Sequence, residues 1–133
     1  MTETLNQESS NVALVRRLYE SGMAPEVVAE VMAEDLVFDI TPGFPFGGVY
    51  NGWPDVAENF FGRIMPELAS YGPVTHAFHG SEDHVFVSGH YHAVSHAGQT
   101  ADIRFTHDWT IKDGKLAQLI QSADSHVLQQ LIA

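Results

Sequence analysis

The sequence predicts an α+β fold in which one curved antiparallel sheet wraps around helices and encloses an apolar pocket. Apolar residues recur at helical spacing through the first half of the chain, and from residue 74 onward their period changes to two. Turn-forming pairs such as Asp113-Gly114 separate the runs of period two. Helices followed by consecutive long hairpins are typical of α+β domains rather than of parallel α/β folds.

Three helices are expected in the first half of the chain, and a short fourth helix is expected at its end. Ser9, Ser10 and Asn11 can cap the first helix, Pro25 suits the first turn of the second, and Pro54 with Asp55 opens the third. Pro66 should kink or end the third helix because its ring clashes with a preceding carbonyl. Asp124 can cap the last helix, whose apolar stripe follows directly.

The expected strands follow one another in hairpins. They cover residues 36–41, 74–79, 84–96 and 101–112, and a further strand begins at Lys115. The Asp113-Gly114 pair is the most specific hairpin signal, because its turn type needs positive φ at both central residues. Residues 41–52 are dense in glycine, proline and aromatic side chains, which predicts a loop.

Composition restricts the class of protein. At 133 residues, with apolar side chains along the whole length, residues 1–133 are expected to form a single domain. The 17 acidic against 6 basic side chains argue against nucleic acid and anionic membranes as partners. The polar N-terminus and the short apolar runs indicate neither signal peptide nor membrane span, so a cytoplasmic location is expected. The lack of cysteine excludes disulfides and thiolate chemistry.

The turns also predict which side chains share a face. Counting back from Asp113-Gly114 pairs His107 with Ile120, and a two-residue turn at Gly98-Gln99 pairs His90 with His107. The predicted concave face then contains a row of apolar and polar side chains: Phe86, Ser88, His90, His92, Ile103, Phe105, His107, Trp109, Ile111, Ser122 and Asp124. Buried polar side chains need partners or water, so this row predicts a pocket. A single bulge would invert part of the assignment.

The last predicted hairpin carries a characteristic pattern, FTHDWTIKDGKL at residues 105–116, followed by Gln121 and Asp124-Ser125. This pattern resembles the last hairpin of SnoaL-like proteins in the NTF2-like (cystatin-like) superfamily, where a histidine, an aromatic residue, a DGK turn and a terminal Asp-Thr/Ser recur. The resemblance covers nearly the whole chain. It implies a cone in which a curved antiparallel sheet wraps around about three N-terminal helices, with a short C-terminal helix.

The resemblance implies a pocket but no single reaction, because one fold hosts many activities. The superfamily includes ketosteroid isomerases, polyketide cyclases, limonene epoxide hydrolases, dehydratases and members without a known reaction. By resemblance, Asp124 stands where the cyclases and epoxide hydrolases carry their base. Ile40 stands where the isomerases carry an Asp, and Ser88 and His90 stand where the hydrolases carry an Arg and an Asp. These departures argue against isomerase and epoxide hydrolase chemistry as such.

Three residues are candidates for catalysis: Asp124, His107 and His90. Asp124 is either a general base in the pocket or only the cap of the last helix. His107 either exchanges protons with a ligand oxygen or is a hydrogen-bonded core histidine. A third reading places His90, His92 and His107 around a metal ion, although no carboxylate is placed to support the ligands.

The candidate ligand-binding residues are mostly aromatic. They are Tyr19, Phe38, Ile40, Phe46, Tyr50, Trp53, Phe61, Ser88, His92, Phe105, Trp109 and Ser122. Within the 41–52 loop and just after it, Phe44, Phe46, Tyr50 and Trp53 could form the mouth of the pocket, with ordinary core packing as the alternative, above all for Trp53.

The leading hypothesis is a site for a small apolar ligand that bears a carbonyl or hydroxyl, with acid/base catalysis of the isomerase, cyclase or hydratase type and no cofactor. The alternatives are a ligand-binding or dimerising module without catalysis, and the histidine metal site. A homodimer is expected from the mixed outward sheet face, assigned to Val85, Val87, Tyr91, Thr106 and Thr110.

Overall fold

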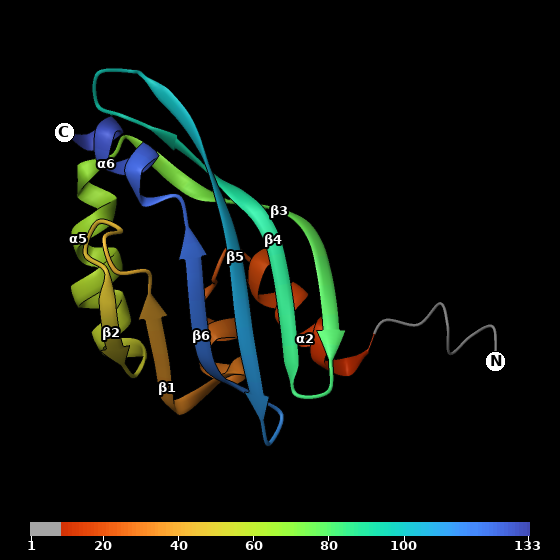
Figure 1. Ribbon diagram of the computed structural model, residues 1–133. Coiled ribbons are helices and arrows are strands. Elements are labelled where there is room, and N and C mark those ends of the chain that lie inside the picture. Colours follow the sequence, from red (N-terminus) through yellow and green to blue (C-terminus); the bar gives the residue numbers. More distant parts are fainter. Residues whose placement is uncertain (1–8) are drawn as a thin grey trace.

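The computed structural model describes residues 9–133 and consists of one curved six-stranded sheet with helices against one face (Figure 1). The strand order is β2-β1-β6-β5-β4-β3, and all neighbours are antiparallel except β1 and β6. The strands are β1 (Met32–Ile40), β2 (Gly48–Asn51), β3 (Ser70–Ser81), β4 (His84–Val94), β5 (Thr100–Lys112) and β6 (Lys115–Ala123). The predicted α+β class with an open, curved sheet is confirmed.

The helices begin where the sequence indicates. They are α2 (Ser10–Glu20), α3 (Pro25–Val31), α4 (Trp53–Asp55), α5 (Gly62–Ile64) and α6 (Ser125–Ile132). The Ser9 side chain accepts a hydrogen bond from the Val12 amide, and the Asp124 side chain accepts one from the Val127 amide, so both predicted caps are confirmed. Within residues 9–133 no helix is long and apolar enough to cross a membrane. The polar residues 1–8 lie outside the described part of the chain.

The expected third helix is divided into four short pieces. Between α4 and α5 the chain forms a π-helical turn, Val56–Phe61, and a 3-10 turn at Met65–Glu67, which contains Pro66, ends the segment. The wide π turn brings the consecutive residues Phe60 and Phe61 to the same cavity. Local hydrophobic spacing does not reveal this change of helical period.

The sheet is longer than the sequence indicates. β2 lies inside the segment predicted to be a loop, β1 begins at Met32, and β3 begins at Ser70. Among residues 9–133, β2 pairs only with β1 and β3 pairs only with β4, so both lie at the edges of the described sheet. Pairing with a neighbouring strand supplies hydrogen bonds that composition alone does not indicate.

The last hairpin follows the predicted turn and then departs from it. Asp113 and Gly114 have φ of 52° and 74°, and Lys112 pairs with Lys115 as predicted. A bulge between Thr110 and Ile111 then displaces the pairing by one residue. The predicted pairing of His107 with Ile120 is therefore wrong, and its observed partner is Gln121.

The hairpin between β4 and β5 has a longer loop than predicted. Val94 pairs with Thr100, and Ser95 closes the loop by accepting a hydrogen bond from the Gln99 amide, 3.0 Å, on its side-chain oxygen. His90 therefore pairs with Arg104 instead of His107, a displacement of three residues (107 − 104). Side chains alternate between the two faces of a sheet. A register shift of β4 by an odd number of residues therefore moves each of its side chains to the face opposite the predicted one.

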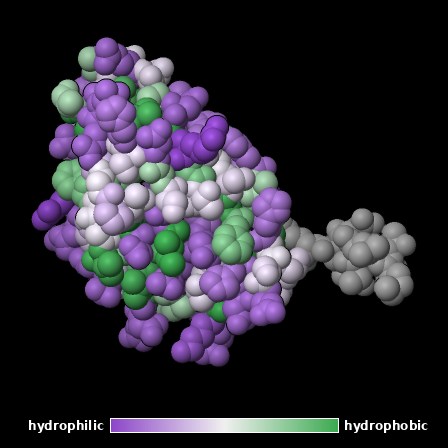
Figure 2. Space-filling model, viewed as in Figure 1, coloured by the Kyte–Doolittle hydropathy of each residue, from purple (hydrophilic) through white to green (hydrophobic). Residues whose placement is uncertain are grey.

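The inverted register corrects several face assignments. On β4, Phe86, Ser88, His90 and His92 point outward, whereas Val85, Val87 and Tyr91 are buried. The outward face is hydrophilic with scattered hydrophobic side chains (Figure 2). Phe86 and Ile120 are exposed hydrophobic residues of this face. Thr106 does lie on this face, as predicted. Homodimer formation stays a prediction.

Candidate functional site

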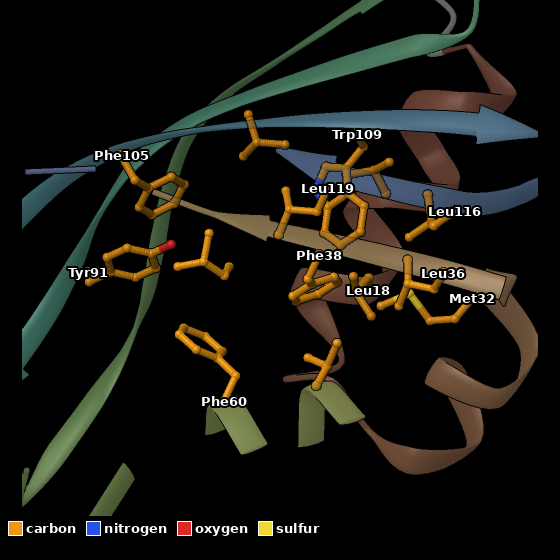
Figure 3. Packing of buried hydrophobic residues seen from close by; sticks show 14 of the residues in the cluster. Leu18, Met32, Leu36, Phe38, Phe60, Tyr91, Phe105, Trp109, Leu116 and Leu119 are labelled. Carbon is orange, nitrogen blue, oxygen red and sulfur yellow. The ribbon is translucent and has the colours of Figure 1, made fainter. Parts of the chain in front are cut away.

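A cavity of about 390 Å³ lies between the concave face of the sheet and the helices. Its wall is mostly apolar and aromatic. The lining consists of Leu18, Tyr19, Gly22, Met23, Phe38, Ile40, Phe60, Phe61, Met65, Tyr71, Gly72, Pro73, Tyr91, His107, Trp109, Leu119 and Gln121. Figure 3 shows Phe38, Phe60 and Tyr91 converging on this region from β1, the π turn and β4. None of the lining residues is Asp, Glu, Lys or Arg.

His107 is held between two tyrosine hydroxyls. Its Nδ1 atom hydrogen-bonds to the Tyr19 hydroxyl on α2, and its Nε2 atom lies 2.5 Å from the Tyr91 hydroxyl on β4. The indole Nε1–H of Trp109 donates to the Tyr19 oxygen at 2.9 Å. Both ring nitrogens are thus partnered, so the histidine is satisfied although it is buried.

Gln121 continues the hydrogen-bonded chain on the other side of Tyr91. Its Nε2 atom donates to the Tyr91 hydroxyl at 2.8 Å, and its Oε1 atom accepts from the Thr41 amide at 3.3 Å. The Thr41 hydroxyl donates to the Gln121 main-chain oxygen at 2.6 Å. The continuous chain Trp109–Tyr19–His107–Tyr91–Gln121 is called the relay below.

Burial keeps the relay uncharged near neutral pH. Desolvation lowers the pKa of His107 to about 3, because no acidic partner compensates for a buried imidazolium. Burial likewise raises the pKa of Tyr19 and of Tyr91 above the usual tyrosine range. The relay therefore offers hydrogen bonds but no formal charge.

Aromatic rings fix the position of the relay. The Phe105 ring stacks on the His107 imidazole with centroids 4.0 Å apart and planes 16° apart. Phe38 meets Trp109 edge to face, at 5.8 Å between centroids. These contacts restrict the rotation of the imidazole and the indole, so their polar atoms keep their direction.

The exposed residues of the cavity lining come from three segments of the chain, one of which is the turn between α2 and α3. Among the lining residues, Gly22, Met65 and Pro73 are exposed. Gly22 and Met23 have φ of 66° and 59°, which makes the chain reverse sharply at this rim.

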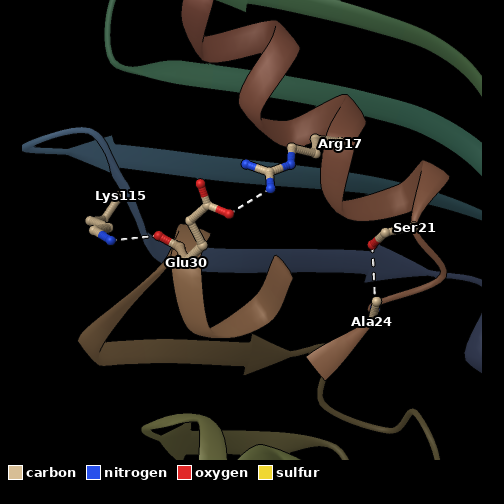
Figure 4. Close-up of polar contacts among 5 residues, drawn as sticks. All are labelled: Arg17, Ser21, Ala24, Glu30 and Lys115. Atoms are coloured by element: carbon tan, nitrogen blue, oxygen red, sulfur yellow. Dashed lines mark hydrogen bonds and ion pairs between the residues drawn. The ribbon is translucent and has the colours of Figure 1, made fainter. Parts of the chain in front are cut away.

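Polar contacts on both sides of this turn hold the rim in place. The Ser21 hydroxyl donates to a carbonyl of α2 and accepts from the Ala24 amide, and Arg17 forms an ion pair with Glu30 on α3 (Figure 4). Lys115 donates to the Glu30 main-chain oxygen. Polar contacts therefore connect the three elements α2, α3 and β6.

The predicted mouth at residues 41–52 is wrong. Phe44 is buried against Tyr91, with ring centroids 6.0 Å apart, and its loop closes the core. Phe46, Tyr50 and Trp53 pack against the hydrophobic core and do not line the cavity. The aromatic content of this segment reflects core closure, the alternative considered for it.

The structure brings some of the candidate residues together. Those that line the cavity are Tyr19, Phe38, Ile40, Phe61, His107 and Trp109, and Phe105 lies directly behind His107. Ser88, Ser122 and Asp124 lie outside the cavity lining. Asp124 is exposed at the start of α6, so the face assigned to it is wrong, because the bulge, whose extra residue lies in β6, turns the rest of that strand over.

The predicted convergence of three histidines is also wrong. His90 contacts His76 at 2.8 Å between ring nitrogens, and His92 contacts Asp102 at 2.8 Å, both on the outward face. His107 lies on the opposite face of the sheet. In the described part of the chain, no three His, Asp or Glu side chains are arranged to hold a metal ion.

Sequence reasoning missed Tyr71, Tyr91 and Gln121. A signal for Tyr91 was present, because Val85, Val87, Tyr91 and Ala93 form the apolar half of β4. That alternation contradicts the register inferred from the Gly98-Gln99 turn. Gln121 reaches the cavity only because of the bulge, which the sequence does not mark.

Solved structures share this architecture. TerC, co-crystallised with polyporic acid, is similar over 93% of this chain and 98% of its own, with 25% identity and a TM-score of 0.84. An NTF2-like protein of unknown function from Burkholderia pseudomallei covers 95% of this chain and 99% of its own, with 22% identity and a TM-score of 0.83. A putative SnoaL-like polyketide cyclase from Jannaschia covers 96% and 97%, with 19% identity and a TM-score of 0.75.

These similarities confirm the predicted NTF2-like, cystatin-like fold. No curated protein sequence matches the chain significantly. The family described as the SnoaL-like domain matches residues 15–119, which is most of the chain and includes β1, β4, β5 and every residue of the cavity lining named above except Gln121. The chain therefore belongs to the SnoaL-like domain family.

Proposed function

We propose that the cavity binds a small, uncharged, largely apolar molecule that carries an oxygen atom. The observation that carries this proposal is the relay, an uncharged hydrogen-bonding group at the wall of an otherwise apolar cavity of about 390 Å³. A cavity with mostly aromatic walls and few polar atoms favours ligands of the same character. The lack of charged lining residues disfavours charged ligands, which would lose their hydration without a compensating partner.

The geometry favours binding over acid/base catalysis. Asp124, the expected base, lies outside the cavity, and the cavity lining contains no carboxylate. His107 is a weak base because its pKa is lowered to about 3. The relay can still polarise a ligand oxygen through a hydrogen bond, without taking up or releasing a proton.

The similarity to TerC supports an aromatic, oxygen-bearing ligand. TerC was co-crystallised with polyporic acid and is similar to this chain over nearly its full length. 1-Indanone, a small neutral molecule with one carbonyl, is the probe for this cavity, and polyporic acid, which is an acid, is the comparison that should bind less well.

The proposal is tested by methyl NMR during titration with each probe. Leu119 and Ile120 are consecutive on β6, but Leu119 lines the cavity and Ile120 is exposed on the outward face. We expect saturable shifts of the Leu119 and Ile40 methyl signals, while the Ile120 signal stays in place. Shifts at Ile120 alone, or no shift with 1-indanone, would contradict the proposal.

A further inference from the structure

We infer that His76 and His90 form a binding site for a divalent transition-metal ion such as Zn²⁺ on the outward face of the sheet. Nε2 of His76 and Nδ1 of His90 face each other at 2.8 Å, and the two ring centroids lie 4.9 Å apart. The two histidines come from β3 and β4, which are neighbours in the sheet (Figure 1). Neither histidine lines the cavity, so the site does not depend on the proposed function.

A bulge in β3 brings His76 toward His90. A regular strand would place His76 opposite Ser88, but Ala77 pairs with Ser88, and His76 is the extra residue of β3. His76 therefore lies nearer to His90 along the strand than regular pairing allows, and bulges commonly redirect a side chain in this way. Gly89 permits the close approach of the two strands here, because a Cβ at Gly89 would lie 2.3 Å from a carbonyl oxygen of β3.

Two facing imidazole nitrogens suit a zinc ion. Imidazole nitrogens bind Zn²⁺ at about 2.0–2.1 Å, and in tetrahedral coordination two such nitrogens lie about 3.3 Å apart. The observed 2.8 Å between the two nitrogens therefore has to widen by only about 0.5 Å to admit the ion. Both nitrogens must be without hydrogen when they bind, and a neutral imidazole can carry its single hydrogen on the other ring nitrogen.

Asp102 on β5 lies on the other side of the His90 ring. Its Oδ1 atom is 3.8 Å from Nε2 of His90 and 2.8 Å from Nδ1 of His92. The hydrogen bond with His92 lowers the pKa of the Asp102 carboxyl from its ordinary value, so the carboxylate is charged near neutral pH. A carboxylate behind a metal-bound imidazole stabilises the positive charge that the ion places on the ring. Arg104 stands opposite His90 on β5, but it is exposed, so water and salt screen its charge.

The protein supplies two ligands, and water molecules complete the coordination of the ion. Among residues 9–133, no three His, Asp or Glu side chains are arranged to hold a metal ion together. The ligand type selects Zn²⁺ over Mg²⁺, because Mg²⁺ prefers oxygen ligands and imidazole suits late transition metals. Two ligands fixed on neighbouring strands bind one ion as a chelate, since the second contact is intramolecular. The loss of either histidine should therefore weaken Zn²⁺ binding by about tenfold or more.

The experiment is a calorimetric titration of the full chain with Zn²⁺, first alone and then with excess Mg²⁺. We expect one Zn²⁺ ion per chain, and Mg²⁺ should not displace it. Binding should weaken as the pH falls below about 6.5, because protonated imidazoles cannot bind the ion. His76→Gln and His90→Gln should each weaken binding by about tenfold or more. Binding that is as tight in His76→Gln as in the wild type would overturn the inference.

Two further histidines of β4 provide matched variants. His84 pairs with Asp108 at 2.8 Å and has no second histidine beside it, so His84→Gln should bind Zn²⁺ like the wild type. His92 lies on the same face of β4 as His90, and His92→Gln tests whether these two histidines hold the ion instead. A loss of binding in His92→Gln without a loss in His76→Gln would overturn the assignment to His76 and His90.

Nitrogen-15 NMR of the histidine rings identifies the ligand atoms in the wild-type chain. Zn²⁺ should shift the signals of Nε2 of His76 and Nδ1 of His90 and leave the His84 ring unchanged. Equal shifts at all exposed histidines would indicate adventitious metal binding only and would overturn the inference. None of these outcomes affects the proposed function, which the titration with 1-indanone tests separately.

Discussion

His107 on β5 and Gln121 on β6 lie opposite each other, although the turn at Asp113-Gly114 alone would pair His107 with Ile120. The bulge between Thr110 and Ile111 makes the difference, because it adds one residue to one strand. Because of the bulge, Gln121 is buried on the concave face opposite His107, and Ile120 is exposed on the outward face. The polar end of the cavity therefore depends on one irregularity in the sheet.

The first prediction concerns the pH dependence of stability. The pKa of His107 is about 3 in the folded protein and near 6.5 in an unfolded chain, so the folded state binds fewer protons between these values. The free energy of unfolding should therefore fall as the pH drops from about 6.5 toward 3, by up to about 1.4 kcal/mol per pH unit from this group.

Urea unfolding of the wild type and of His107→Gln at several pH values measures this effect. The other histidines are present in both proteins and cancel in the difference. If the free energy of unfolding changed with pH equally in the two proteins, the His107 imidazole would take up its proton in the folded state as readily as in the unfolded chain.

The second prediction concerns the link between Thr41 and Tyr91. Gln121→Leu leaves the Thr41 amide without the side-chain carbonyl that it contacts, and it removes a donor from Tyr91. We expect a loss of about 1–3 kcal/mol in the free energy of unfolding, the usual cost of unpaired buried polar groups. Gln118→Leu, on the outward face of the same strand, is the matched control and should change stability by less than about 0.5 kcal/mol.

The third prediction separates capping from catalysis at Asp124. Asp124→Ala should lower the free energy of unfolding by about 1 kcal/mol, because the side chain accepts from the Val127 amide. Asp124→Asn should keep the cap and the stability. Affinity for 1-indanone, measured by calorimetry, should be the same in both variants. Weaker binding in Asp124→Asn would place the carboxylate in the site after all.

The fourth prediction concerns the ring that stacks on His107. A Cβ at Gly89 would lie 2.3 Å from the Val74 carbonyl oxygen and 2.9 Å from the Phe105 ring. Gly89→Ala should therefore displace Phe105 and cost about 1–3 kcal/mol of unfolding free energy. Gly72→Ala is the control, since a Cβ there meets nothing within 4 Å and φ is not positive. Equal unfolding temperatures of the two variants would contradict this packing.

Particular residues show which predictions from the sequence succeed. Ser9, Pro25 and Asp124 mark helix starts correctly, because capping and proline geometry act over a few neighbouring residues. The prediction of a turn at Asp113-Gly114 is confirmed for the same reason. His90, His92 and Asp124 were assigned to the wrong face, because a register counted over many residues inverts with one miscounted turn or bulge.

The sequence by itself determined the fold class, the family pattern of the last hairpin and the capped ends of its helices, since these depend on local conformational preference and on hydrophobic period. Only the tertiary structure decided that His107 meets Tyr19, Tyr91 and Trp109 in one cavity while the other histidines point outward. The physical reason is that side chains alternate along a strand, so their placement depends on loop length and bulges, which are selected by packing across the whole sheet.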